Sequence, residues 1–303
     1  MKHKITHYLQ RYPVTKRIYI GIKTFMRNIQ VLFTQDLGTF SRNYDIGLLR
    51  YELAAELPHT SVPSIKTIDE TLDMLIHSHN SLCRFGDGEF ENILQHPQNF
   101  SNAALALLSK RLLEVLGNKD SRICIGLPRK LYEGKQNLSS LERLFWRSAP
   151  IKQYYSIIEQ YCLPQTIYYA VEVTMPFCYT DINLEQFFHK IRKIWANKDI
   201  TLICGDGIFK NLEYDIFDNV KSRETIYAPN KNAFTQYESI LKRALQIDKH
   251  RLIIIILGQT ATVLAYDLAK QGFRALDFGH IAKSYDWYKR NKLHDPTTFF
   301  DPD

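Results

Sequence analysis

The stretch Leu-Ile-Ile-Ile-Ile-Leu at residues 252–257, followed by Gly-Gln-Thr-Ala-Thr at 258–262, decides the fold class of this chain. Six consecutive aliphatic residues are apolar on both sides of the pleat, which is typical of a central strand in a parallel sheet. A glycine turn then leads into a helical pattern over Thr260–Gln271. The stretch therefore predicts one strand–helix unit of an α/β protein.

Similar units recur on both sides of this stretch. Further strands are expected at Ser81–Phe85, Arg122–Leu127, Thr166–Val171, Ile200–Cys204, Glu224–Tyr227 and Arg274–Phe278. Helical patterns occur at Thr67–His77, Ala103–Leu116, Leu184–Trp195 and Ala233–Leu245. Strands that alternate with helices predict a Rossmann-like, mostly parallel sheet with helices on both faces.

The composition is that of a globular protein. Of 303 residues, 45% are hydrophobic and 23% are charged, which excludes collagen-like, low-complexity and wholly disordered classes. The net charge of +7 comes from residues 1–35, which hold seven Lys or Arg residues and no acidic residue. A nucleic-acid partner is not expected, because such proteins usually spread basic residues over the folded surface. Five cysteines without a CxxC pair indicate reduced thiols in a cytoplasmic protein.

The basic segment is expected to form an arm. We predict an arm and transition segment at 1–60 and a main domain at 61–303. Apolar residues recur at helical spacing at Ile18, Ile22, Phe25, Ile29 and Leu32. Such a basic amphipathic helix favours peripheral contact with the inner face of the cell membrane through residues 1–35, and packing on protein is the alternative. We expect no signal peptide. We also expect no membrane span, because a span needs roughly 20 consecutive apolar residues.

Ligands of open α/β sheets bind beyond the carboxyl ends of the strands. The sequence RFGDGE at 84–89 follows one predicted strand. In an extended turn, Asp87 and Glu89 would point to one side, and two hard oxygen ligands suit Mg²⁺ or Mn²⁺. Gly86 permits a tight turn, and Arg84 is expected to bind a phosphate or to fix a carboxylate. The alternative is an ordinary Asp-Gly turn with solvated acids.

Other strand ends carry further candidates. Gly258 and Thr260 begin a helix whose backbone N–H groups can bind an anion, although Thr260 as an ordinary N-cap is an equal alternative. After the last strand come Asp277, His280 and Asp286; of these, Asp286 is a candidate general base. Asn232 follows another strand, where it can cap a helix or hydrogen-bond a ligand.

Three motifs together resemble a known family. They are RFGDGE at 84–89, NAF at 232–234 and GQTATVLAYDLAKQGFRALDFGH at 258–280. They are similar to the bacterial GT-D-type glycosyltransferases, formerly a domain of unknown function, found in surface-glycan and adhesin-glycosylation clusters. The weaker resemblance covers most of residues 65–290. It implies a GT-D-like fold, and it implies that Asp87 and Glu89 bind a divalent metal and the diphosphate of a nucleotide sugar.

We therefore expect a metal-dependent glycosyltransferase that moves a sugar from a nucleotide sugar, a UDP-sugar, to a glycan acceptor on lipid or protein. The product would be cell-surface polysaccharide or glycoprotein. The expected substrate-binding residues are Arg84, Gly86, Asn232, Gly258, Thr260 and Asp277, and the expected catalytic residues are His280 and Asp286. The alternatives are an S-adenosylmethionine-dependent methyltransferase, with Asp87 or Asp277 on a ribose, and a non-catalytic nucleotide- or glycan-binding protein.

Overall fold

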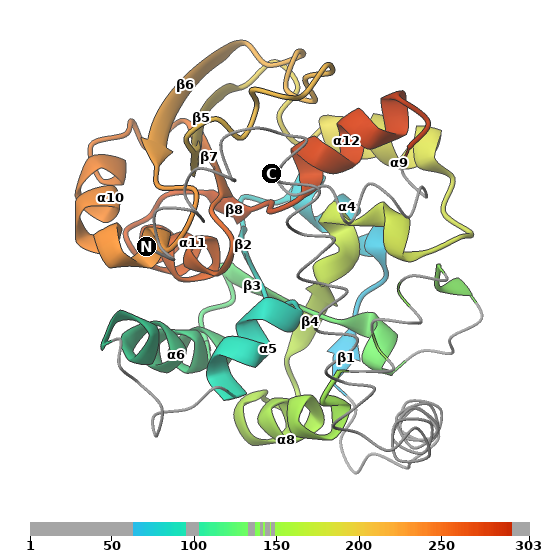
Figure 1. Cartoon of the computed structure of the whole chain (residues 1–303), viewed down its shortest axis with the longest axis vertical. Coiled ribbons are helices and arrows are strands. Elements are labelled where there is room, and N and C mark those ends of the chain that lie inside the picture. The colour runs from blue at the N-terminus through green and yellow to red at the C-terminus, as the bar shows by residue number, and fades with distance from the viewer. Residues whose placement is uncertain are drawn as a thin grey trace, which may run out of the picture. The chain divides into compact units, whose positions relative to one another are not determined.

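The structure is a computed structural model that describes residues 63–94, 103–132, 137–139, 142, 146 and 149–292 (Figure 1). The predicted arm at 1–60, with its amphipathic helix, lies outside the described residues. The division of the chain at residue 60 therefore stays a prediction.

The described residues form one sheet of eight strands in the order β1-β4-β3-β2-β8-β7-β5-β6, and each neighbouring pair is parallel. This confirms the predicted α/β class and each of the seven predicted strands. The two-residue β1 was not predicted, because two residues are too few to show a pattern. The strands are β1 (Ser64–Ile65), β2 (Ser81–Arg84), β3 (Ile123–Leu127), β4 (Ile167–Ala170), β5 (Asp199–Gly205), β6 (Ser222–Ala228), β7 (Leu252–Ile256) and β8 (Ala275–Asp277).

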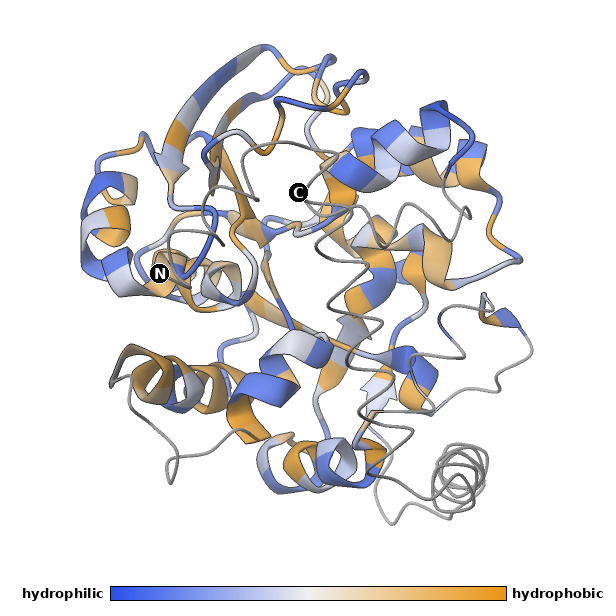
Figure 2. Cartoon of the chain, in the orientation of Figure 1, coloured by the Kyte–Doolittle hydropathy of each residue, from blue (hydrophilic) through white to orange (hydrophobic). Residues whose placement is uncertain are grey.

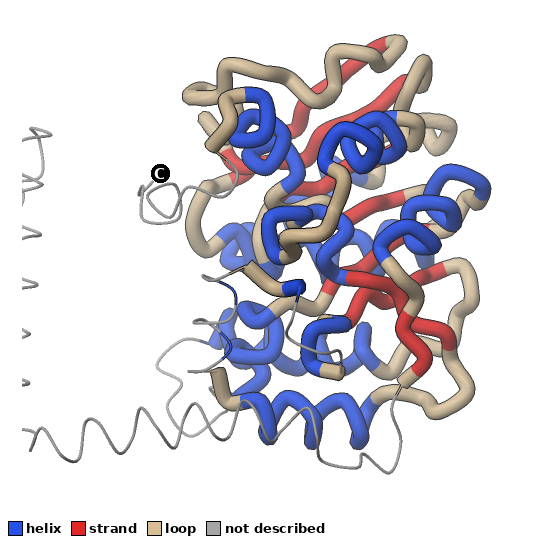
Figure 3. The backbone as a smooth tube through the Cα atoms, turned by 90° about the vertical axis from the view of Figure 1, so that its right-hand side faces the viewer, coloured by secondary structure: helices blue, strands red, loops and turns tan. Residues whose placement is uncertain are grey.

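Helices cover both faces of this sheet, and Figure 3 shows the strands with helices packed beside them. The α-helices are α4 (Ile68–His77), α5 (Asp87–Leu94), α6 (Ala103–Leu116), α8 (Ile151–Tyr161), α9 (Leu184–Arg192), α10 (Tyr237–Ala244), α11 (Gln259–Lys270) and α12 (Ile281–Lys289). Short 3₁₀ helices include η2 (Arg129–Leu131), η4 (Val171–Thr174), η5 (Pro176–Cys178) and η6 (Ala233–Gln236). Within the described residues, no helix is long and apolar enough to cross a membrane.

The core lies between the sheet and these helices. On one face, side chains of α4, α9 and α12 share a buried cluster with β2, β5, β7 and β8. On the other face, α11 packs on β2, β7 and β8, with α6 and α10 beside it (Figure 1). Strand β7 is buried along its whole length between β5 and β8, as its aliphatic sequence predicts, and Figure 2 shows its hydrophobic colour.

Local sequence explains where α4 begins and how the segment after β6 is divided. Helix α4 starts at a capping box, in which Thr67 Oγ1 accepts from Glu70 N at 3.1 Å and Glu70 Oε2 accepts from Thr67 N at 2.8 Å. The single helix predicted at Ala233–Leu245 is instead η6 followed by α10. The residue before η6, Asn232, has a left-handed backbone with φ 54°, which favours a tight first turn.

The prediction of an extended turn at residues 84–89 was wrong, because helix α5 begins at Asp87. Two acidic residues in the first turn interact favourably with the positive end of the helix dipole. Phe90 and Ile93 are buried and give the segment an apolar side that packs on the domain. Six residues were too short a window to show this helical spacing.

Candidate functional site

A cavity of about 470 Å³ opens where the carboxyl ends of β2, β5, β6, β7 and β8 meet. Such a volume lies in the range of small-molecule sites. Eight of the ten residues predicted for the site line it: Arg84, Gly86, Asp87, Glu89, Asn232, Gly258, Thr260 and His280. The parallel register brings these residues together from loops far apart in the sequence.

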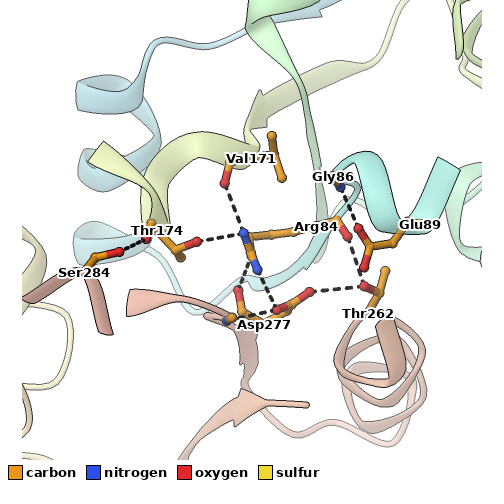
Figure 4. A network of polar contacts seen from close by, with 9 residues as sticks. Arg84, Gly86, Glu89, Val171, Thr174, Thr262, Asp277 and Ser284 are labelled. Carbon is orange, nitrogen blue, oxygen red and sulfur yellow. Dashed lines mark hydrogen bonds and ion pairs between the residues drawn. The ribbon is translucent and has the colours of Figure 1, made fainter. Parts of the chain in front are cut away.

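Arg84 lies at the end of β2 and fixes a carboxylate (Figure 4). Its Nε donates to Asp277 O at 2.9 Å, and its Nη2 pairs with Asp277 Oδ1 at 3.2 Å. Its Nη1 donates to Thr174 Oγ1 at 2.7 Å and to Val171 O at 3.2 Å. Of the two roles considered for Arg84, the contacts thus show the pairing with a carboxylate.

Asp277 is enclosed by this network and is not among the residues that line the cavity. Its Oδ2 lies 3.1 Å from the Thr262 hydroxyl, which also lies 3.0 Å from Arg84 O, and its Oδ1 accepts from Gly279 N at 3.3 Å. Gly279 has φ 24°, and a Cβ there would lie 2.0 Å from Arg84 Nη2. The close approach therefore requires glycine, and Asp277 holds the strand ends together.

Asp87 and Glu89 lie in the first turn of α5, on either side of Gly88. Successive helix residues are about 100° apart, so these two side chains leave the helix in different directions. Both still line the cavity, because the N-terminal end of α5 faces it. The Glu89 carboxylate also turns back and accepts from Gly86 N at 2.7 Å. The carboxylates therefore share one cavity without the common direction that an extended turn would give.

Glu89 is electrostatically unusual. Burial raises its pKa to about 7, and the nearby charge of Asp277 adds to this rise, while Arg84 opposes it. A cation close to such a carboxyl favours the ionised form. A cation bound in the cavity next to Glu89 would therefore lower the pKa of this carboxyl and favour its ionised form.

The donor set fits a divalent cation by its chemistry. Within the described residues, no three His, Cys, Asp or Glu side chains are grouped to hold a metal ion. Mg²⁺ is commonly held by one or two carboxylates, with phosphate oxygens and water completing the shell. Asp87 and Glu89 provide two such oxygen donors in a cavity large enough for a phosphorylated ligand.

The N-terminus of α11 forms another wall of the cavity. The helix begins at Gln259, with Gly258 as N-cap, so the predicted start at Thr260 was one residue late. Gly258 has φ 52° and ψ −143°, a conformation open to glycine and to few other residues. No side chain caps this end among the described residues, and backbone N–H groups at a helix start can bind an anion.

The cavity also has apolar lining residues. Phe234 of η6, together with Leu105 and Leu108 of α6, lines the cavity. Asn232 adds an amide next to Phe234, and Gly205 at the end of β5 lies against Asn230. The cavity lining therefore combines charged and polar groups with apolar side chains.

Helix α12 places the last candidates differently. His280 is exposed and lines the cavity, but Asp286 does not line it. Asp286 is 1% exposed; its Oδ1 accepts from Glu213 N at 2.8 Å and from Tyr214 N at 3.1 Å, and its Oδ2 pairs with Arg290 at 3.2 Å. These contacts give Asp286 a structural role, in which it holds the backbone at residues 213 and 214 and the Arg290 side chain.

Sequence reasoning missed Lys283, which lines the cavity from α12. It lies one turn after His280, and this spacing would have been a signal had α12 been recognised as a helix. The sequence predicts no helix at Ile281–Lys289, so this spacing assigned no role to the basic residue.

Comparison with solved structures finds the same fold in other proteins. A structure described as "The highly conserved domain of unknown function 1792 has a distinct glycosyltransferase fold" superposes with a TM-score of 0.69 and 27% identity, over 82% of this chain and 87% of that one. A structure described as a new glycosyltransferase from Streptococcus sanguinis gives a TM-score of 0.68 and 27% identity, over 77% of this chain and 87% of that one.

Curated relatives lead to the same family. The chain is 29% identical over 239 residues to a probable glycosyl transferase Gly of Streptococcus gordonii, covering 76% of this chain and 34% of the relative. It is 29% identical over 229 residues to glycosyltransferase GlyD of Streptococcus pneumoniae serotype 4, covering 74% and 28%. The chain spans about a third of the length of these relatives. Residues 82–295 match the family described as Glycosyltransferase GT-D fold, and the chain belongs to that family of glycosyltransferases.

Proposed function

We propose that this glycosyltransferase depends on a divalent metal and transfers a sugar from a nucleotide sugar to a glycan acceptor on lipid or protein. The observation that carries the proposal is the shared cavity of Asp87, Glu89 and the N-terminus of α11. Oxygen ligands and helix N–H groups in one cavity suit a diphosphate with its cation. The choice of a UDP-sugar, and the role in cell-surface polysaccharide or glycoprotein synthesis, rest on the family resemblance.

The polar groups of the cavity lining suit the leaving group. When the bond from the sugar to the diphosphate breaks, negative charge grows on the diphosphate. Backbone N–H groups of α11 stabilise this charge without reorganising, and Lys283 adds a positive charge at the same cavity. Asp87 and Glu89 would hold Mg²⁺ or Mn²⁺, which supplies further charge neutralisation when bound.

The other walls provide places for the nucleoside and the acceptor. Phe234, Leu105 and Leu108 offer an apolar surface for a base and ribose, with the Asn232 amide beside them. His280 stands at the cavity with an exposed side chain, where it can take the proton of an acceptor hydroxyl.

The basic segment suggests where the acceptor is met. We propose that residues 1–35 hold the protein at the inner face of the cell membrane. Each Lys or Arg near anionic lipid contributes about 1 kcal/mol, and the segment has seven. Co-sedimentation with vesicles of anionic and of neutral lipid, with and without residues 1–35, tests this. Equal binding of both chains to anionic vesicles would contradict it.

A thermal-shift panel tests the donor and the metal together. The purified chain is heated with UDP-, GDP- and CMP-sugars, with and without Mn²⁺, and with S-adenosylmethionine. A ligand at 100 times its Kd stabilises by about 2.7 kcal/mol, which is visible as a higher melting temperature. A Mn²⁺-dependent shift with UDP-sugars is expected. A shift with S-adenosylmethionine alone would favour the methyltransferase alternative, and binding without sugar transfer would favour the non-catalytic one.

A matched pair of variants sharpens the test. Asp87→Asn should abolish the Mn²⁺-dependent shift and leave the fold intact, because asparagine is tolerated in the first helical turn. Glu238→Gln is the control, since Glu238 is an exposed acid in the first turn of α10 and does not line the cavity. Donor binding by Asp87→Asn equal to that of Glu238→Gln would exclude the proposed metal site.

A further inference from the structure

The side chain of Gln259 joins the two helix N-termini that face the cavity. Its Nε2 donates to Gly88 O of α5 at 2.6 Å, and its Oε1 accepts from Asn92 Nδ2 at 2.9 Å. The Gly88 carbonyl can only accept, so this contact fixes which end of the amide is nitrogen. The remaining oxygen then matches the amide donor of Asn92.

The two contacts lie on one face of α5. Gly88 and Asn92 are four residues apart, which is one helical turn, so Gln259 spans the first turn of α5 from the side. A Cβ on Gly88 would lie 3.0 Å from Gln259 Nε2, which shows how closely the amide approaches the backbone.

The bridge continues into a third helix. Asn92 is buried, and its carbonyl accepts from Ser109 Oγ of α6 at 3.3 Å. Gln259 is itself the first residue of α11. Polar contacts therefore connect α11, α5 and α6, and each of these three helices contributes residues to the cavity lining.

This position has a consequence for the two carboxylates. Gly88 separates Asp87 from Glu89, so a contact that fixes Gly88 also fixes the rotation of α5 about its axis. The directions of both carboxylates follow from that rotation. The anchor is the first residue of α11, next to the backbone N–H groups that face the cavity.

We propose that Gln259 is a positioning residue for sugar transfer. It holds the first turn of α5 against the N-terminus of α11, so that the carboxylates and the helix N–H groups act on one diphosphate. The inference rests on the proposed function. A displacement of about 1 Å at such a site can lower the rate by about 100-fold.

The test replaces the amide without shortening the side chain. Gln259→Met keeps the length and removes both hydrogen bonds. Gln271→Met is the matched control, because Gln271 is exposed at the opposite end of α11. We expect Gln259→Met to lower kcat by about 10- to 100-fold with a smaller change in the KM for the donor. Gln271→Met should match the wild-type chain, and a wild-type kcat in folded Gln259→Met would overturn the inference.

A double variant asks whether Asn92 acts through the same contact. If so, Asn92→Ala combined with Gln259→Met should reduce kcat little beyond the greater of the two single effects. Multiplying effects would mean that the two residues act independently, and this result would overturn the proposed bridge.

Hydrogen exchange gives a readout that does not need turnover. In Gln259→Met, backbone amides of α5 should exchange faster than in the wild type, and in Gln271→Met they should not. Unchanged exchange in α5 would overturn the inference. Absence of sugar transfer by the wild-type chain would instead overturn the proposed function, so the two failures are distinguishable.

Discussion

The buried pair of Arg84 and Asp277 gives a sharp prediction for stability. Their side chains are 9% and 2% exposed, and the N–O distance is 3.2 Å. In Asp277→Ala, the Arg84 guanidinium stays buried without its carboxylate. Removing one partner of a buried pair costs about 3–5 kcal/mol, most of it from the uncompensated charge. The Thr262 hydroxyl and Gly279 N–H lose an acceptor as well.

An exposed pair of similar length provides the control. Lys221 Nζ lies 3.1 Å from Asp199 Oδ2, with side chains 69% and 36% exposed. Solvent screens such a pair, and its contribution is about 0–1 kcal/mol. Lys221→Ala should therefore change stability little, although the N–O distances of the two pairs are nearly the same. The comparison therefore separates the effect of burial on stability from the effect of the N–O distance.

Urea unfolding followed by circular dichroism measures the free energy of unfolding of both variants, and thermal unfolding measures their melting temperatures. For a domain of this size, a loss of about 3–5 kcal/mol lowers the melting temperature by roughly 6–20 °C. The double variant Arg84→Met/Asp277→Leu should recover part of the loss, since no charge remains buried. A loss under about 1 kcal/mol in Asp277→Ala would refute the reasoning, because it would mean that Arg84 finds water or another partner.

Three further predictions concern the same region. Gly279→Ala should destabilise by about 1–3 kcal/mol in urea unfolding, because its Cβ would collide with Arg84 Nη2, and wild-type stability would exclude that collision. Glu89 ionises in the unfolded chain near the ordinary pKa of 4.5, while the folded chain keeps the proton until about 7. Without metal, the wild type should therefore lose stability relative to Glu89→Gln as the pH rises from 4.5 to 7, and a constant difference across that window would contradict the raised pKa. Asp286→Asn should keep its transfer rate within about 10-fold, whereas loss of a general base lowers rates by about 10²–10⁴-fold, so a larger loss at an unchanged fold would restore Asp286 as the base.

Much of the fold could be predicted from the sequence, because strands and helices have local periods. The aliphatic run of β7 and the glycine turn before α11 lie within a dozen residues, and the structure confirms both. The carboxyl ends of the strands follow once the strands are known, so the chain itself pointed to Asp87, Glu89 and Gly258 as residues of one site.

The sequence by itself thus determined the α/β class, the strand order along the chain and the loops that meet at the cavity. Only the tertiary structure decided what each side chain does there. Arg84 and Asp277 are 193 residues apart, Gln259 is 171 residues from Gly88, and Asp286 is held by backbone 72 and 73 residues away. Such contacts depend on which strands become neighbours in the sheet, and no local period of the chain carries that information.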